Sequence, residues 1–228
     1  MSDSCERSRV ATSVEPGNPL PGGTSEQSGI RRPLAPTRCL SPRLWVIFAS
    51  AIVASIFIHE IGHCLVAWVY GCPAIPTPAK EYILQPLSPA AQNQVALGGI
   101  IGTVAVLVGA LCWMLRHPTP TRSALLAGAM TAPGFYTLRF LLAGRGHDAT
   151  EFQEAQAAMG LTYSGHVLDW MFLGLFLMAA ALWLWRTRPR LTWRLVGRLF
   201  IGAVAALVVL VLLQSVNNTV FDPFFQPR

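Results

Sequence analysis

Hydrophobic residues occur along this chain in long blocks, and they do not alternate with polar residues. A helix needs about twenty such residues to cross the hydrocarbon core of a bilayer. Five blocks approach or exceed that length, at residues 44–70, 95–115, 123–143, 167–185 and 196–216. The pattern therefore predicts an all-α protein, a polytopic transmembrane bundle of about five spans.

The polar stretches between and beyond these blocks predict how the chain is divided. Residues 1–42 are rich in Ser, Pro, Gly and Arg, so they cannot bury enough apolar surface to fold, and we expect a disordered cytoplasmic tail. Residues 73–94 contain five prolines, which predict extended or re-entrant chain instead of a regular helix. Pro133 and Gly134 predict a kink in the third span. The membrane domain is expected to cover residues 43–217, and residues 218–228 to form a short C-terminal tail.

Composition supports a membrane protein and excludes a second, soluble domain. Hydrophobic residues make up 53% of the chain and charged residues 12%, about half the charged share of an average soluble protein. The net charge of +6 could indicate a nucleic-acid partner. The arginines, however, cluster beside the hydrophobic blocks as they do in cytoplasmic loops, so we expect contact with a lipid bilayer and not with nucleic acid.

The distribution of basic residues predicts the orientation of the spans. With a cytoplasmic N-terminus, the opposite side carries only Lys80, Arg145 and Arg228. The cytoplasmic side then carries Arg31, Arg32, Arg38, Arg43, Arg116, Arg122, Arg186, Arg188, Arg190 and Arg194. This asymmetry is typical of the positive-inside rule. The five cysteines show no CxxC spacing and are interpreted as small apolar residues or loop thiols.

The first span contains the pattern His59-Glu60-Ile61-Gly62-His63, which fits H-E-x-x-H. Residues four apart lie on one face of a helix, so both imidazoles can bind one tetrahedral Zn²⁺. Glu60 is then placed to accept a proton from a metal-bound water, and Gly62 leaves room for another chain to approach. A chance match is the alternative, but ionisable residues inside a span are costly and indicate function.

The segment "HEIGHCLVAWVYG" resembles the "HELGHALAA…G" signature of the site-2 protease family of intramembrane zinc metalloproteases, especially its small bacterial members. The likeness is strong over the first span, looser over residues 73–165, and does not extend to the fifth span or the tail. It implies hydrolysis of a peptide bond in a membrane-embedded or membrane-proximal substrate, with Zn²⁺ as cofactor, in a bacterial cytoplasmic membrane.

The resemblance also implies an acidic third ligand downstream of the motif. The segment "GRGHDATEFQEAQAAMG" is similar to the Gly-rich segment that carries this Asp in small members, which places the role on Asp148. Asp148 and both histidines are predicted on the same side of the membrane. The alternatives are that Asp148 caps the following helix, that Asp169 is the ligand, or that His147 is. Asp169 could instead pair with His166 or Arg139.

Several further interpretations stay open at this point. Arg139 is expected to extend to the membrane interface, and the alternative is a partner for a carboxylate in the site. Asn93 either ends the loop or binds a substrate backbone. The non-helical segment 74–87 could add a strand to an unwound substrate. The competing functions are a non-proteolytic metal-binding scaffold and an ion channel or transporter, and the sequence does not indicate an oligomeric state.

Overall fold

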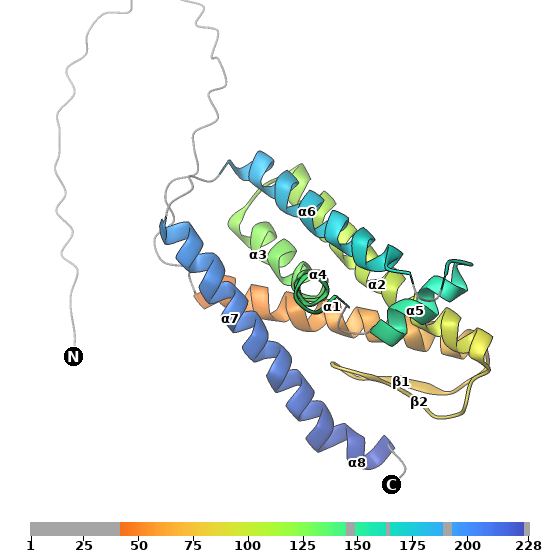
Figure 1. The fold of residues 1–228 in the computed structure, drawn as a ribbon. Helices are drawn as coiled ribbons and strands as arrows, with labels where there is room; N and C mark the ends of the chain where they lie inside the picture. Colours follow the sequence, from red (N-terminus) through yellow and green to blue (C-terminus); the bar gives the residue numbers. More distant parts are fainter. Residues whose placement is uncertain (1–41, 145–148, 163–164, 189–192, 226–228) are drawn as a thin grey trace, which may run out of the picture. The chain divides into compact units, whose positions relative to one another are not determined.

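The computed structural model describes residues 42–144, 149–162, 165–188 and 193–225 (Figure 1). The elements in chain order are α1 (Pro42–Val69), β1 (Ala74–Pro76), β2 (Glu81–Ile83), α2 (Pro89–Arg116), α3 (Pro120–Ala129), α4 (Thr131–Ala143), α5 (Ala149–Ala158), α6 (Val167–Thr187), α7 (Trp193–Val216), the π-helix η1 (Asn217–Phe221) and α8 (Asp222–Phe225). The stretch 1–41, predicted to be disordered, lies outside the described residues.

The prediction of an all-α bundle with about five spans is confirmed. Four described helical segments are long and apolar enough to cross a membrane: α1, α2, α6, and the segment Phe200–Phe225, which joins most of α7 to α8. The bent pair of α3 and α4 makes up to five. The chain therefore has the character of an integral, multi-pass membrane protein.

Helix α1 runs for 28 residues, or about 42 Å, which exceeds the thickness of the hydrocarbon core. It ends just before Gly71, whose φ of 74° reverses the chain in a conformation that glycine adopts without steric cost. After this turn, the Trp68 ring nitrogen donates a hydrogen bond of 3.0 Å to the carbonyl of Ala74. The segment that follows therefore folds back against the end of α1.

Helices α1 and α2 pack with their backbones in close contact, at glycines of both helices. A Cβ atom added at Gly98 would lie 2.5 Å from the carbonyl oxygen of Gly62 and 2.7 Å from Val66. A Cβ atom at Gly102 would lie 2.8 Å from the carbonyl of Ile58. Small residues at such positions let helix backbones approach closely. The space beside Gly62 is filled by α2 of the same chain.

The proline-rich segment after α1 forms a two-stranded antiparallel hairpin, β1–β2, with Ile75 opposite Tyr82. Extended chain was predicted here, and the structure confirms it for the strands. The prediction was wrong for residues 89–94, which belong to α2. Proline is tolerated at the first position of a helix, and the Ser88 hydroxyl caps α2 by accepting from the backbone of Ala91 at 3.3 Å.

The third predicted span is bent by 46° where α3 meets α4. The break falls at Met130, three residues before Pro133. Proline has no backbone N–H, and its ring crowds the carbonyl four residues earlier, here that of Ala129. The predicted kink is therefore present, and it divides the span into two helices.

Helix α5 lies in the loop that joins the third and fourth predicted spans, and it packs against α2 and α6. Phe152 and Ala155 of α5 are buried with Ala96 and Ile100 of α2 and Phe172 of α6. The side chain of Gln156 also fastens the connection to α6, because it donates to the carbonyl of Gly165 at 2.9 Å. These contacts fix α5 over the N-terminal part of α2.

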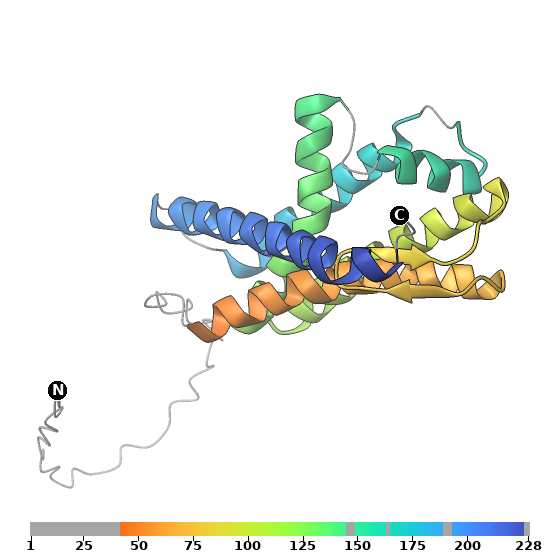
Figure 2. The same cartoon turned by 90° about the horizontal axis from the view of Figure 1, so that it is seen from below.

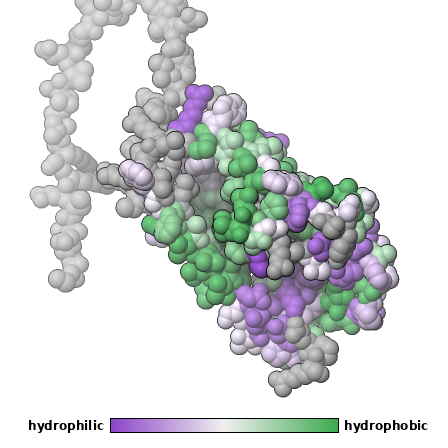
Figure 3. All heavy atoms as spheres, viewed as in Figure 1, coloured by the Kyte–Doolittle hydropathy of each residue, from purple (hydrophilic) through white to green (hydrophobic). Residues whose placement is uncertain are grey.

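Helix α7 continues without a break through η1 into α8. The boundary predicted at residue 217 therefore falls inside a helical segment that extends to Phe225. On the face shown in Figure 3, hydrophobic residues cover much of the helices, and hydrophilic residues gather toward the end with the hairpin, α5 and α8. Figure 2, which views the ribbon from below, shows the hairpin alongside α1.

The α1–α2 contact makes a testable prediction about stability. Gly98→Ala places a methyl group against the backbone of Gly62, so we expect it to destabilise the protein by roughly 1–3 kcal/mol through overpacking. Gly109→Ala is the matched control on the same helix, because nothing lies within 4 Å of its added Cβ. Thermal unfolding in detergent measures both. Equal midpoints for the two variants would contradict the close contact.

Candidate metal centre

The two histidines of the H-E-x-x-H pattern lie on one face of α1, buried at 7% and 4% exposure. Their Nε2 atoms are 3.0 Å apart, and the ring planes are perpendicular. This is the arrangement expected from a spacing of four residues, with both rings turned toward one point. The structure therefore brings the His59 and His63 rings together as the spacing predicts.

Glu151 of α5 completes a triangle with these histidines. Its Oε1 atom lies 3.5 Å from Nε2 of His59 and 3.6 Å from Nε2 of His63. The three ligand atoms come from two elements far apart in sequence, and the packing of α5 on α2 brings them together. Two imidazoles and a carboxylate in this arrangement could hold a metal ion.

Hydrogen bonds on the far side of each ring fix the orientation of the imidazoles. Nδ1 of His63 lies 2.8 Å from the carbonyl oxygen of Val95, which can only accept, so this nitrogen carries the proton. Nδ1 of His59 lies 2.9 Å from the hydroxyl of Thr103. Partners of this kind orient metal-binding histidines and leave Nε2 as the ligand atom.

These two hydrogen bonds also bear on what lies between the rings. A neutral His63 that donates from Nδ1 presents a lone pair at Nε2. Two such lone pairs at 3.0 Å repel each other unless a proton or a cation lies between them. The geometry is therefore suited either to a hydrogen bond between the two rings or to a cation at the centre of the triangle.

The absence of a side chain at Gly99 makes room for the two rings. A Cβ atom added there would clash with Cε1 and Nε2 of His63 and would lie 2.9 Å from Cε1 of His59. The imidazoles therefore lie directly against the backbone of α2. Any other residue at this position would displace at least one ligand.

A second group of acidic residues adjoins the triangle through His63. Carboxylate oxygens of Glu60 and Glu81 and a ring nitrogen of His63 lie within 4.8 Å of one another. Glu60 is buried on α1, and Glu81 is the first residue of β2. The hairpin therefore extends a carboxylate to the predicted catalytic glutamate.

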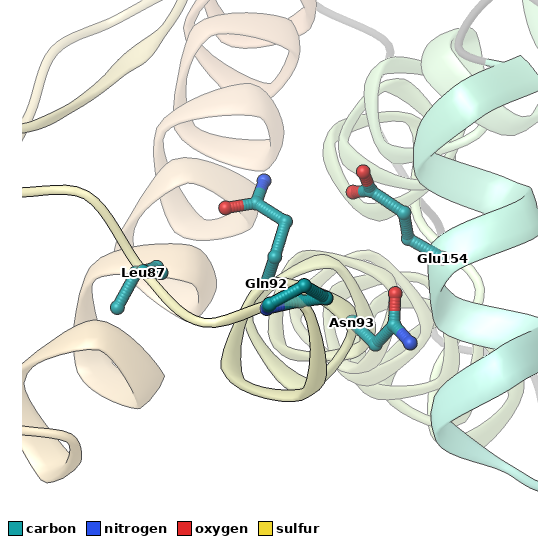
Figure 4. Close-up of a pocket in the computed structure, with 5 residues that line it drawn as sticks. Leu87, Gln92, Asn93 and Glu154 are labelled. Carbon is teal, nitrogen blue, oxygen red and sulfur yellow. The ribbon is translucent and has the colours of Figure 1, made fainter.

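An open hollow of about 500 Å³ lies between the start of α2 and α5 (Figure 4). Gln92, Asn93 and Glu154 line it, and Asn93 and Glu154 face each other from the two helices. A second hollow of about 400 Å³ shares Gln92 and Leu87 with the first and follows residues 83–87 to Phe225. Glu154, which lines the first hollow, lies one helical turn from Glu151 on α5.

The remaining residues considered from sequence are placed as follows. Asp148 and His147 lie outside the described residues. Asp169 accepts from Nδ1 of His166 at 3.0 Å, which is the pairing considered as its alternative role. Arg139 is exposed on α4, and the described residues show no contact between it and a carboxylate. Asn93 belongs to α2 and faces the hollow.

Sequence reasoning did not identify Glu151 or Glu81 as candidates. Glu151 follows Asp148 by only three residues in the sequence, so spacing alone could not choose between the two acids. Glu81 follows a turn in the chain, and only the hairpin pairing brings it back to α1. In both cases the missing information is tertiary.

The fold and the site together define a polytopic helical membrane-type protein with a cluster of two buried histidines and a half-buried glutamate. Comparison with protein-family models, curated proteins and solved structures found no match to this chain. What this cluster can bind is therefore inferred from its own geometry.

The triangle predicts which acid is needed for metal binding. Glu151→Gln removes the carboxylate, so we expect the purified variant to lose stoichiometric bound metal, as His59→Ala should. Glu154→Gln, one turn along the same helix, should retain it, because Glu154 lines the hollow and is not in the triangle. Elemental analysis of the purified proteins measures this. Metal loss from Asp148→Ala with retention in Glu151→Gln would assign the ligand to Asp148 instead.

Proposed function

We propose that this protein is an intramembrane zinc metalloprotease that hydrolyses a peptide bond of a membrane-embedded or membrane-proximal substrate. The observation that carries the proposal is the triangle of His59, His63 and Glu151, with edges of 3.0, 3.5 and 3.6 Å. Ligand atoms at zinc distances of about 2.0–2.2 Å and tetrahedral angles are separated by about 3.3–3.5 Å. The two His–Glu edges, 3.5 and 3.6 Å, lie at or just above this range, and the His–His edge of 3.0 Å lies below it.

The donor set supports zinc and a catalytic role. Catalytic zinc sites use three protein ligands and keep the fourth position for water or substrate, and two histidines with a glutamate form one such set. Bound zinc would supply a water of lowered pKa and would polarise a peptide carbonyl. Three ligand groups of the described chain converge in the triangle, which is the number that such a catalytic site uses.

Glu60 is the residue we assign to proton transfer. It adjoins His59 in the sequence, is buried at 6% exposure, and has its carboxylate within 4.8 Å of a ring nitrogen of His63. In this role the carboxylate accepts a proton from the attacking water and afterwards donates one to the leaving amine. Its place beside the triangle, and outside its ligand set, is consistent with a base.

The hollows and the hairpin supply a path for an extended substrate. Among the described residues the sheet has two strands, so a further strand could be added beside it. The second hollow follows the chain after β2, and the first continues it past Gln92 and Asn93 toward α5. Side-chain amides can both donate to and accept from an unwound peptide backbone. We therefore assign this path to the substrate.

The basic residues support a cytoplasmic N-terminus as part of the proposal. Arg43 precedes the apolar part of α1, and Arg116, Arg122 and Arg186 lie at or just beyond the ends of other spans that return to that side. The metal centre lies in the second half of α1, and with this orientation it is in the outer half of a bacterial cytoplasmic membrane.

The assignment of Glu60 makes a prediction that separates chemistry from metal binding. Glu60→Gln should lower the rate of peptide hydrolysis by at least about a hundredfold, the usual lower range for losing a general base. Its zinc content should stay near that of the wild type, because Glu60 is not in the triangle. Cleavage of a panel of transmembrane peptides in proteoliposomes, alongside elemental analysis, measures both.

Each other outcome of that experiment identifies a different function. If the wild type binds zinc but cleaves no peptide that the Glu60→Gln variant leaves intact, the protein is a metal-binding scaffold. Ion flux in the same vesicles, with no tightly bound metal, would indicate a channel or transporter. Either result would overturn the protease proposal.

The substrate path is tested by a change in substrate affinity. Replacement of both Gln92 and Asn93 by alanine removes the amides that line the hollow, so we expect KM to rise about tenfold with little change in kcat. Gln94→Ala is the matched control, because this neighbouring amide does not line either hollow. An unchanged KM in the double variant would exclude this path.

A further inference from the structure

The β1–β2 hairpin covers the metal centre on one side. Ala74 of β1 packs against Cys64 and Ala67 of α1 and Val95 of α2, and all four residues are buried. Glu81 of β2 extends its carboxylate to within 4.8 Å of Glu60 and His63. Lifting the hairpin would therefore expose Cys64 and open the space beside the ligand His63.

The hairpin is in turn fastened by the C-terminal segment 217–225, which we call the latch segment. The Asn217 side chain donates to the Tyr82 hydroxyl at 2.8 Å, and that hydroxyl donates to Asp222 at 2.5 Å. Further contacts join the Thr77 hydroxyl to Asn217 at 2.5 Å, the Lys80 ammonium to Asp222 at 3.8 Å, and the rings of Tyr82 and Phe225 at 5.0 Å between centroids.

These contacts are shielded from water on the hairpin side. Thr77 and Asn217 are each 1% exposed, and Tyr82 is 4% exposed. Burial, and then the hydrogen bond to Asp222, raise the pKa of Tyr82 to about 12, so its hydroxyl remains a donor at any physiological pH. A buried polar group that loses its partner destabilises the closed arrangement, so these hydrogen bonds must be kept or exchanged together.

The rest of the fifth span adds little to this attachment. Among the described side chains of α7 only Ala206 is buried. Apolar residues gain little by leaving lipid for a protein surface, so an exposed apolar helix is held mainly by its specific contacts. The π-helical turn at Asn217–Phe221 places the latch segment against the hairpin, and such turns are frequent at functional positions.

We propose that the contact between the latch segment and the hairpin is a gate that regulates access to the metal centre. With the hydrogen bonds made, the hairpin stays closed over His63 and Glu60. With the latch segment released, the hairpin lifts and the site opens. This inference rests on the proposed metal site for its consequence, but movement of the hairpin can be measured without it.

Cys64 provides a reporter that does not depend on metal or catalysis. It is fully buried beneath Ala74, so a thiol reagent reaches it only when the hairpin or its packing opens. In the full-length protein with Cys5, Cys39, Cys72 and Cys112 replaced by alanine, the rate of N-ethylmaleimide addition to Cys64 is followed by mass spectrometry, with EDTA present throughout. Asn217→Leu and Asp222→Asn should raise this rate about tenfold, the order expected for losing one or two buried hydrogen bonds.

Matched controls separate gate opening from general loosening. Asn218→Leu changes the neighbouring residue, which is exposed, and should leave the rate within about twofold. A second reporter protein, with Cys64→Ala and Ala179→Cys, places the thiol in the fully buried core between α2 and α6, away from the hairpin. Its reaction rate should not change in the latch variants. If Asn217→Leu fails to fold, Tyr82→Phe, which removes one hydroxyl only, decides the question.

The outcomes for the gate and for the proposed function differ. Faster Cys64 modification with faster loss of bound zinc to EDTA would support both. Faster modification in a protein that binds no zinc would support a mobile hairpin and overturn the metal site. An unchanged Cys64 rate in Asn217→Leu, Asp222→Asn and Tyr82→Phe, or an equal rise for the thiol of the second reporter protein, would overturn the gate.

Discussion

The candidate metal centre depends on the close approach of two helix backbones. Packed helices usually lie 8–10 Å apart, roughly, with side chains between them. Here Gly62 faces Gly98, and Gly99 leaves the space that the two imidazoles fill. The same approach brings the Val95 carbonyl and the Thr103 hydroxyl within hydrogen-bonding distance of the Nδ1 atoms. The glycines at the helix interface therefore make room for the two imidazoles and bring the groups that orient them within reach. Within lipid, where apolar burial gives little drive for helix association, such close packing and hydrogen bonding hold helices together.

The balance of charge around the triangle also favours a cation. Three carboxylates, from Glu60, Glu81 and Glu151, lie near two imidazoles in a largely buried space. Like charges repel strongly where water is excluded, and leaving a charge there without a partner is costly. A cation between Glu151 and the histidines would offset part of that negative charge. The clustering of these acids beside two imidazoles is therefore compatible with a cation at the centre of the triangle.

Much of the fold and half of the site could be predicted from sequence because they depend on local pattern. The spans follow from block length, the bend from Pro133, and the pairing of His59 with His63 from a spacing of one helical turn. The start of α2 was misplaced because Pro89 acts there as a first helical residue, which a count of prolines does not distinguish from a breaker. The third ligand could not be chosen, because the packing of Phe152 and Ala155 on α2 decides which acid of α5 reaches the histidines.

The C-terminal span contributes no ligand to the described site, yet its end contacts the element that covers it. Residues 135 to 140 positions apart in the chain meet in the hydrogen bonds of Asn217 and Asp222 with the hairpin. A hairpin of two three-residue strands is marginal by itself. Its position over the site therefore depends on contacts with other elements, namely the packing of Ala74 on α1 and α2, the hydrogen bond from Trp68, and the latch segment. Because lipid competes for the apolar face of α7 but not for buried hydrogen bonds, the polar contacts determine where this span lies. The sequence feature that governs access to the centre is thus the polar pair Asn217 and Asp222, at the end of an otherwise apolar helix.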